Sequence, residues 1–302
     1  MLIAAAIWGL SFTAQKEAAN VSPFTLVFVR SLLGTVFLFF LIVILDKALK
    51  NGRHLISKKG LDFTKTELIG GIACGIVLSS ASVLQQIGIG SGTDAGKAAF
   101  ITALYVVLVP VFSLVLKKRA PINAWISVGI AVVGFYLLCI KGDLSLEYSD
   151  ALVLVCAVIF TVHILVIDRF SPKCDGVIMS CIQFAVVTVV TLICALIFEL
   201  PMDISSITSS IGPIIMLGIG SSGIAYTLQI IAQRNVNPAV ASIIMSLESV
   251  FGVLGAAIIL GEKMTNREYA GCAIVFVAVI LSQLDFSAFK KKNTAEVHES
   301  KT

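Results

Sequence analysis

Ten stretches of apolar residues, each close to the length that crosses a lipid bilayer, recur along this 302-residue chain. A membrane-spanning helix needs roughly 20 such residues, because the hydrocarbon core is about 30 Å thick and each helical residue advances about 1.5 Å. Turn-forming residues separate the runs, as in Asn20-Val21-Ser22-Pro23 and Asn235-Val236-Asn237-Pro238. We therefore expect an all-α protein with ten transmembrane helices, near residues 1–18, 24–45, 67–89, 94–116, 122–140, 150–167, 177–198, 211–232, 237–260 and 267–285.

The composition supports a membrane protein. Charged residues make up 13% of the chain, about half of the roughly 25% that is typical of soluble domains. The net charge of +4 comes mainly from short loops, so it indicates orientation and gives no reason to expect nucleic acid as a partner. Nearly all seven cysteines lie within apolar runs without a CxxC pair, and we interpret them as buried apolar side chains. We expect neither a metal nor a cofactor.

Lysine and arginine are concentrated in alternate loops. They lie at residues 47–65, 117–119, 169–173 and 234 and in the tail at 290–301, whereas the opposite loops hold Lys141, Lys263 and Arg267 among several acidic residues. Cytoplasmic loops of membrane proteins carry the excess of basic residues. We therefore expect a multi-pass protein of the cell (cytoplasmic) membrane with both termini in the cytoplasm. Residues 1–15 have no basic leader, and we interpret them as the first helix rather than a signal peptide.

Short sequence matches about half a chain apart indicate an internal repeat. Leu84-Gln85-Gln86-Ile87 matches Leu228-Gln229-Ile230-Ile231, and Val109-Pro110-Val111-Phe112 parallels Glu248-Ser249-Val250-Phe251. We predict two five-helix halves, at residues 1–145 and 146–288, followed by a basic tail at 289–302. Because five is odd, the second half enters from the opposite side, which gives an inverted repeat. Transporters built in this way bind substrate near the membrane midplane, between the halves.

Two charged residues lie inside the apolar runs. Glu248 is in the middle of the run at 237–260, where an acidic residue costs roughly 2.5–3.5 kcal/mol to insert. Its carboxylate either faces a hydrated cavity and binds a substrate amine or a proton, or belongs to a buried ion pair. Arg30 lies about two turns into its helix, deeper than a helix-end side chain needs to be. It either binds a carboxylate or phosphate of a ligand or pairs with Glu248 or Glu17.

Amide and aromatic side chains extend the candidate site. Gln85 and Gln229, which we expect to be equivalent by the repeat, either line a cavity or hydrogen-bond between helices. Trp8, Tyr105 and Tyr226 would stack on an organic substrate, although Trp8 also suits an anchoring role at the membrane interface.

Two further polar residues are candidates of the same kind. Lys97 either contacts substrate or pairs with Asp94, three residues earlier on the same helix. His163, close to the expected cytoplasmic end of its helix, either relays protons or is a packing residue with its hydrogen bonds satisfied.

Motifs of enzymes are absent from the sequence. There is no HExxH, no GxSxG and no Walker motif, so we predict neither an enzyme nor a nucleotide-driven pump. A channel remains an alternative, but channels usually form their pores from rings of charged residues or carbonyl loops. A single carboxylate and a single guanidinium in the membrane suit a closed binding site better.

Several segments together resemble the EamA-type members of the drug/metabolite transporter superfamily. These segments are Trp8-Gly9-Leu10-Ser11-Phe12, Pro23 followed by Arg30, Tyr105-Val106-Val107-Leu108-Val109-Pro110, Ser246-Leu247-Glu248-Ser249-Val250-Phe251 and Leu260-Gly261-Glu262. The resemblance covers nearly the whole chain and implies a ten-helix inverted-repeat carrier, usually an exporter of amino acids or related metabolites. It also implies a cavity surrounded by the first, third, fourth, sixth, eighth and ninth helices. Two features depart from the family pattern: Glu248-Ser249 replaces a common Glu-Pro, and Lys117-Lys118-Arg119 replaces a common Gly-Glu.

We therefore predict a secondary active transporter that exports a small metabolite, such as an amino acid or amine, by alternating access with proton coupling or exchange. Glu248 would receive an ammonium group or the coupling proton, and Arg30 would bind the opposite charge. The alternatives are a facilitative channel, a multidrug or cation exporter, and a receptor or assembly factor on a transporter fold. The expected partners are the small-molecule substrate and the lipid bilayer. A monomer would suffice, and an oligomer stays open.

Overall fold

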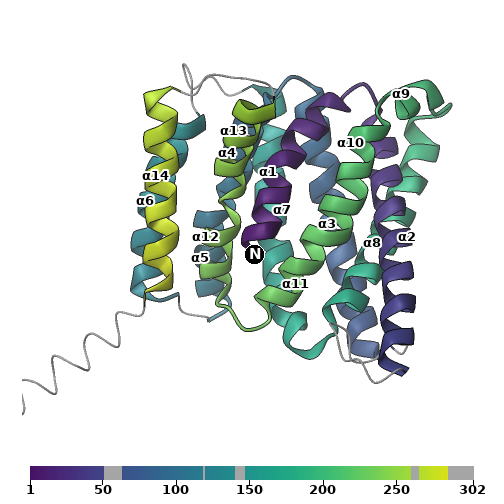
Figure 1. The fold of residues 1–302 in the computed structure, drawn as a ribbon, viewed down its shortest axis with the longest axis horizontal. Coiled ribbons are helices and arrows are strands. Elements are labelled where there is room, and N and C mark those ends of the chain that lie inside the picture. Colours follow the sequence, from purple (N-terminus) through teal and green to yellow (C-terminus); the bar gives the residue numbers. More distant parts are fainter. Residues whose placement is uncertain (51–62, 118–119, 140–146, 260–264, 285–302) are drawn as a thin grey trace, which may run out of the picture.

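The computed structural model describes residues 1–50, 63–117, 120–139, 147–259 and 265–284, and this part of the chain is helical without strands (Figure 1). Each expected apolar run is mainly helical over its described residues, and two of the runs are interrupted. Seven helices or series of consecutive helices in this part are long and apolar enough to cross a membrane. They are α2 (Pro23–Lys50), α3 (Lys65–Gly90), α4 (Ala95–Ala103) with α5 (Tyr105–Val115), α7 (Tyr148–Phe170), α8 (Gly176–Phe198), α10 (Ile211–Ile215) with η2 (Met216–Ala225) and α11 (Tyr226–Gln233), and α12 (Pro238–Met245) with α13 (Glu248–Ile259).

Three more helices lie beside these spans: α1 (Leu2–Glu17), α6 (Ile122–Cys139) and α14 (Asn266–Gln283). Two short helices, η1 (Ser171–Lys173) and α9 (Ile204–Ser209), connect neighbouring spans. The basic tail at 289–302 and the segment 51–62, on which part of the orientation prediction rests, lie outside the described residues.

Several helices begin at capping residues. At the start of α3, the hydroxyl of Thr64 accepts the N–H of Glu67 (3.3 Å), and the Glu67 carboxylate accepts the N–H of Thr64 (2.6 Å), which is a capping box. Thr265 and Glu268 form the same arrangement at the start of α14. Glu67 also accepts the N–H of Asp175 (2.8 Å), the N-cap residue of α8. One buried carboxylate therefore connects the starts of α3 and α8.

The bundle has α6 with α14 at one edge and α2 with α8 at the other (Figure 1). Between these edges, α3 packs against α7 and α8, and α1 packs against α13 and η2. Glycines allow close approach: a Cβ atom at Gly71 would lie 2.6 Å from the Ile182 side chain, and one at Gly34 would lie 3.0 Å from the Gly218 carbonyl oxygen. Because lipid tails are as apolar as the side chains, close packing of this kind is what holds membrane helices together.

Two spans are interrupted near their middle, and each interruption places a polar residue at the start of a new helix. After a break at Leu104, α5 begins at Tyr105, and after a break at residues 246–247, α13 begins at Glu248. Pro110 in α5 has no N–H and crowds the carbonyl group one turn earlier. Ser246 turns its hydroxyl back to a carbonyl three residues earlier (2.7 Å), and such bonds bend helices. A third span contains the 10-residue π-helix η2.

Candidate substrate-binding cavity

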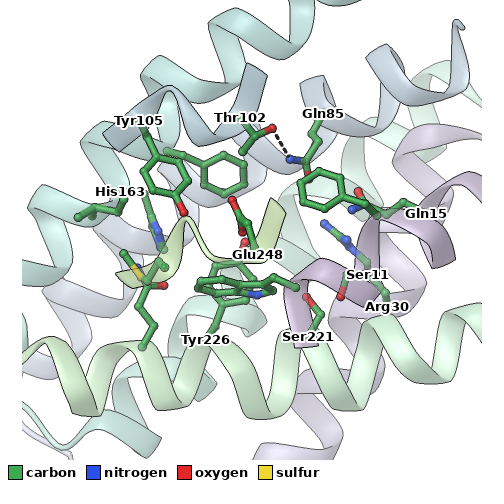
Figure 2. A pocket seen from close by; sticks show the side chains of 16 residues that line it. Ser11, Gln15, Arg30, Gln85, Thr102, Tyr105, His163, Ser221, Tyr226 and Glu248 are labelled. Atoms are coloured by element: carbon green, nitrogen blue, oxygen red, sulfur yellow. Dashed lines mark hydrogen bonds between the residues drawn. The ribbon is translucent and has the colours of Figure 1, made fainter. Parts of the chain in front are cut away.

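A cavity in the bundle is lined by 16 residues that come from most of the spans (Figure 2). Protein atoms leave about 520 Å³ free within it, part of which is open to the outside. All the site residues predicted from the sequence line this cavity, with the exception of Lys97. The lining residues are Trp8, Ser11, Phe12, Gln15, Arg30, Gln85, Thr102, Tyr105, Phe160, His163, Ile164, Ser221, Tyr226, Gln229, Met245 and Glu248.

Glu248 and Arg30 are the only carboxylate and guanidinium among the described residues that line the cavity, and both are almost fully buried, with exposed fractions of 5% and 6%. Within the described part of the chain, neither forms an ion pair, so the alternative that Arg30 pairs with Glu248 or with the exposed Glu17 is not observed. The Oε1 atom of Glu248 and the Nε atom of Arg30 also have no hydrogen-bond partner among the described residues. A buried charge without an ion-pair partner is destabilising, so a ligand group of opposite charge would stabilise each of them.

The two charged side chains enter the cavity from different sides. Figure 2 shows Glu248 between Tyr105 and Arg30, with the Arg30 guanidinium directed into the cavity next to Gln15. Glu248 keeps this place because α1 crosses α13 very closely: a Cβ atom at Gly9 would lie 2.6 Å from the Glu248 carbonyl oxygen. The first turn of α13 is therefore fixed against the backbone of α1.

The two glutamines predicted from the sequence both line the cavity and form side-chain hydrogen bonds. Gln85 lines the cavity and donates from Nε2 to the Thr102 hydroxyl (3.1 Å) on α4. Gln229 lines it as well and donates to Gln233 (3.4 Å), while its own Oε1 has no partner among the described residues. Gln233 in turn donates to the Ile164 carbonyl (2.7 Å) on α7. These amides therefore connect helices and also present acceptor atoms to the cavity.

Tyr226 is the centre of an aromatic cluster along the cavity. Its ring lies 4.9 Å from that of Trp8 and 5.4 Å from that of Phe184, both in edge-to-face arrangements, and 5.9 Å from the His163 ring. Trp8 lines the cavity, where stacking on a ligand is open to it. His163 is buried, and its Nε2 lies 2.8 Å from Oε1 of Gln183 on α8.

Lys97 lies outside the cavity lining and makes a different contact. Its ammonium group pairs with Asp150 of α7 at 2.5 Å, and the Asp150 side chain is 1% exposed. The hydroxyl of Thr93 (3.0 Å) and the N–H of Glu147 (2.9 Å) also donate to the Asp150 carboxylate. The ion pair therefore crosses from α4 to α7, whereas the sequence suggested Asp94, on the same helix.

Sequence reasoning missed several polar residues of the cavity: Ser11, Gln15, Thr102 and Ser221. Ser11 and Gln15 are four residues apart, which places them on one face of α1. That spacing is the signal that could have found them. Thr102 and Ser221 look like ordinary small residues of membrane helices, and only the packing reveals them.

Comparisons with known proteins give a consistent result. The model of the EamA-like transporter family matches residues 1–140 and 148–284. An uncharacterized transporter of Archaeoglobus fulgidus is 29% identical over 286 residues, 94% of this chain and 84% of that protein. An uncharacterized transporter of Clostridium kluyveri is 24% identical over 289 residues, 93% of this chain and 88% of that protein. A solved crystal structure has the same fold, with a TM-score of 0.72 at 15% identity over 93% of this chain and 94% of that one. The chain thus belongs to the EamA-like transporter family and is a multi-pass membrane protein.

Proposed function

We propose that this transporter binds a small metabolite with an ammonium group, such as an amino acid or an amine, and exports it across the cell membrane by alternating access. One observation carries the proposal: Glu248 and Arg30, two buried opposite charges, line one cavity without an ion-pair partner among the described residues. An amino acid brings an ammonium group for Glu248 and a carboxylate for Arg30. In the absence of substrate, Glu248 is also able to take the coupling proton.

Alternating access would use two halves of five helices each, related as an inverted repeat. Two matches of the family model, one to each half of the chain, support this arrangement. Helix contacts also support an inverted repeat. In such a repeat the helices of the first half correspond in chain order to those of the second: α1 to α7, α2 to α8, α3 to α10–η2–α11, α4–α5 to α12–α13, and α6 to α14. Under this exchange, the contact of α3 with α7 becomes that of η2 with α1, and the contacts of α6 with α14 and of α2 with α8 map onto themselves. Residues from both matched segments, 1–140 and 148–284, line the cavity, which is expected of such transporters.

The proposed orientation has both termini in the cytoplasm. Among the described residues, Arg169, Lys173 and Arg234 are close together at one end of the bundle, where Arg234 donates to the carbonyl groups of Ser171 and Cys174. Basic residues at one end support a cytoplasmic location for that end. Export would then carry substrate away from it, driven by the proton gradient or by exchange.

Ligand-induced stabilisation tests the substrate site. Purified protein is heated with amino acids, amines, polyamines, cationic drugs and sugars, and a ligand at about 100 times its Kd should add about 2.7 kcal/mol to the folded state. We expect an amino acid or amine to stabilise the wild type and Glu17→Gln, a matched control at an exposed carboxylate. Glu248→Gln should lose this effect. If Glu248→Gln keeps the full shift, the assigned role of Glu248 is wrong.

Counterflow in proteoliposomes tests the transport mechanism. Vesicles loaded with an unlabelled ligand should accumulate the labelled ligand transiently, because an alternating carrier exchanges one molecule for another. A facilitative channel would show non-saturating flux without accumulation. Stabilisation by cationic drugs alone would favour a multidrug exporter, for which Arg30 would have no ligand group to bind.

A further inference from the structure

His163 occupies the part of the cavity that lies away from Arg30. Figure 2 shows it beside Tyr105, on the far side of Glu248 from the guanidinium. The side chain is 1% exposed, so what its two ring nitrogens can do is decided by the residues around it. One nitrogen, Nε2, lies 2.8 Å from Oε1 of Gln183.

Gln183 itself does not line the cavity. It is fully buried on α8, with an exposed fraction of 0%, and its Nε2 has no hydrogen-bond partner among the described residues. With the Gln183 amide oriented so that Oε1 faces the ring, this oxygen can only accept, and the contact pairs with a proton on Nε2 of His163. In a neutral imidazole ring, the nitrogen opposite the donor is an acceptor, whereas an imidazolium donates through both nitrogens. Nδ1 of His163 is then left as an acceptor.

We infer that Gln183 is a positioning residue that holds the His163 ring as the Nε2–H tautomer, so that Nδ1 accepts a hydrogen bond from a donor group of the transported molecule. This inference rests on the proposed function, because it concerns the same cavity. Glu248 and the unpartnered Oε1 of Gln229 are acceptors too. The part of the cavity that His163 lines therefore selects ligands with N–H or O–H groups at that end.

The chemistry of selection follows from this arrangement. A ligand that presents a hydroxyl, an amide N–H or an ammonium group satisfies Nδ1. A ligand of the same shape with a methylated nitrogen or an ether oxygen leaves Nδ1 buried without a partner, which costs affinity. N-methylation should weaken binding even where the cavity has room for the methyl group.

The tautomer is measured directly by NMR on protein labelled with 15N in its histidine rings. The chain has three histidines, and the signal that disappears in His163→Asn identifies this residue. We expect a protonated Nε2 and an unprotonated Nδ1 in the wild type, and a mixture of tautomers in Gln183→Met, which removes the acceptor at similar volume. A wild-type ring that is protonated on Nδ1, alone or together with Nε2, overturns the inference. This measurement needs no substrate, so its result stands apart from the fate of the proposed function.

Transport kinetics test the consequence for the ligand. The probes are propylamine with its N-methylated series up to N,N,N-trimethylpropylammonium, which carry no hydroxyl, and leucine with N-methylleucine and N,N,N-trimethylleucine. For Gln183→Met we expect a KM raised about 3- to 10-fold, the equivalent of one hydrogen bond, a kcat within about twofold and a weaker preference for the unmethylated probe.

Controls separate positioning from general damage to α8. Thr191→Val removes a buried hydroxyl on α8 that bonds only to its own helix, and we expect it to retain the KM and the preference of the wild type. His163→Asn with Gln183→Met should cost no more than His163→Asn alone. Additive losses, or equal affinity for methylated and unmethylated probes in the wild type, would overturn the inference, whereas absence of transport for every probe would count against the proposed function.

Discussion

Breaking the ion pair between Lys97 and Asp150 should destabilise the protein unequally, depending on which partner is removed. In Lys97→Met the carboxylate stays buried at 1% exposure, with only the Thr93 hydroxyl and the Glu147 N–H as donors. Removing one partner of a buried pair costs about 3–5 kcal/mol. Two donors remain and Lys97 is 25% exposed, so we expect about 2–3 kcal/mol. In Asp150→Asn the lysine can turn towards solvent, and we expect about 1–2 kcal/mol.

The double variant provides the decisive comparison. Lys97→Met with Asp150→Asn has no unpaired charge, so its cost should fall below the sum of the two single costs by about 1 kcal/mol or more. Unfolding in mixed micelles with increasing SDS, followed by tryptophan fluorescence, gives the three free energies. Additive costs, or a larger effect of Asp150→Asn than of Lys97→Met, would refute the reasoning that burial of the carboxylate controls the energetics.

Three further predictions concern other parts of the bundle. Gly9→Ala places a Cβ atom 2.6 Å from the backbone of α13 and should lower the stability by about 1–3 kcal/mol. Gly129→Ala, whose Cβ atom would have no atom within 4 Å, should raise the stability by up to about 1 kcal/mol. Thermal unfolding of both variants makes the comparison. Glu67→Gln should lower the free energy of unfolding in SDS by about 1–3 kcal/mol. Each of the two carboxylate oxygens accepts a backbone N–H, and a glutamine has only one oxygen that accepts. Arg30→Gln should lose stabilisation by an amino acid and keep that by the matching decarboxylated amine in thermal shift; equal loss of both would contradict a carboxylate-binding role.

Much of the architecture follows from the sequence because of the cost of placing polar groups in lipid. Runs of about 20 apolar residues identify helices, and the same cost singles out Glu248 and Arg30, which the structure places in one cavity. By length and hydropathy, seven spans meet the requirement in the described residues, and the ten-helix inverted repeat stays a prediction. Over their described residues, α1, α6 and α14 do not meet this requirement.

The contacts between distant segments could not be predicted from the sequence. The partner of Lys97 is Asp150, more than 50 residues away, because α4 crosses α7 at that level, while local spacing favoured Asp94. Gln15 lies one turn from a helix end and resembles an interfacial residue, yet α1 directs it into the cavity. The breaks before Tyr105 and Glu248 are not marked in the apolar pattern of their runs. A single sequence contains propensities, and these placements are decided by tertiary contacts.

The close crossing of α1 and α13 at Gly9 affects how a mutational scan of this protein should be interpreted. Gly9, Gly71, Gly75 and Gly88 each face a neighbouring helix so closely that an added Cβ atom would lie 2.6 Å or less from it. None of them contributes a side chain to the cavity, yet each should tolerate almost no substitution. A scan that scores growth alone will therefore give these glycines the same severe effect as Glu248. Only a measure that separates protein abundance from activity per molecule will distinguish the residues that build the bundle from those that select its cargo.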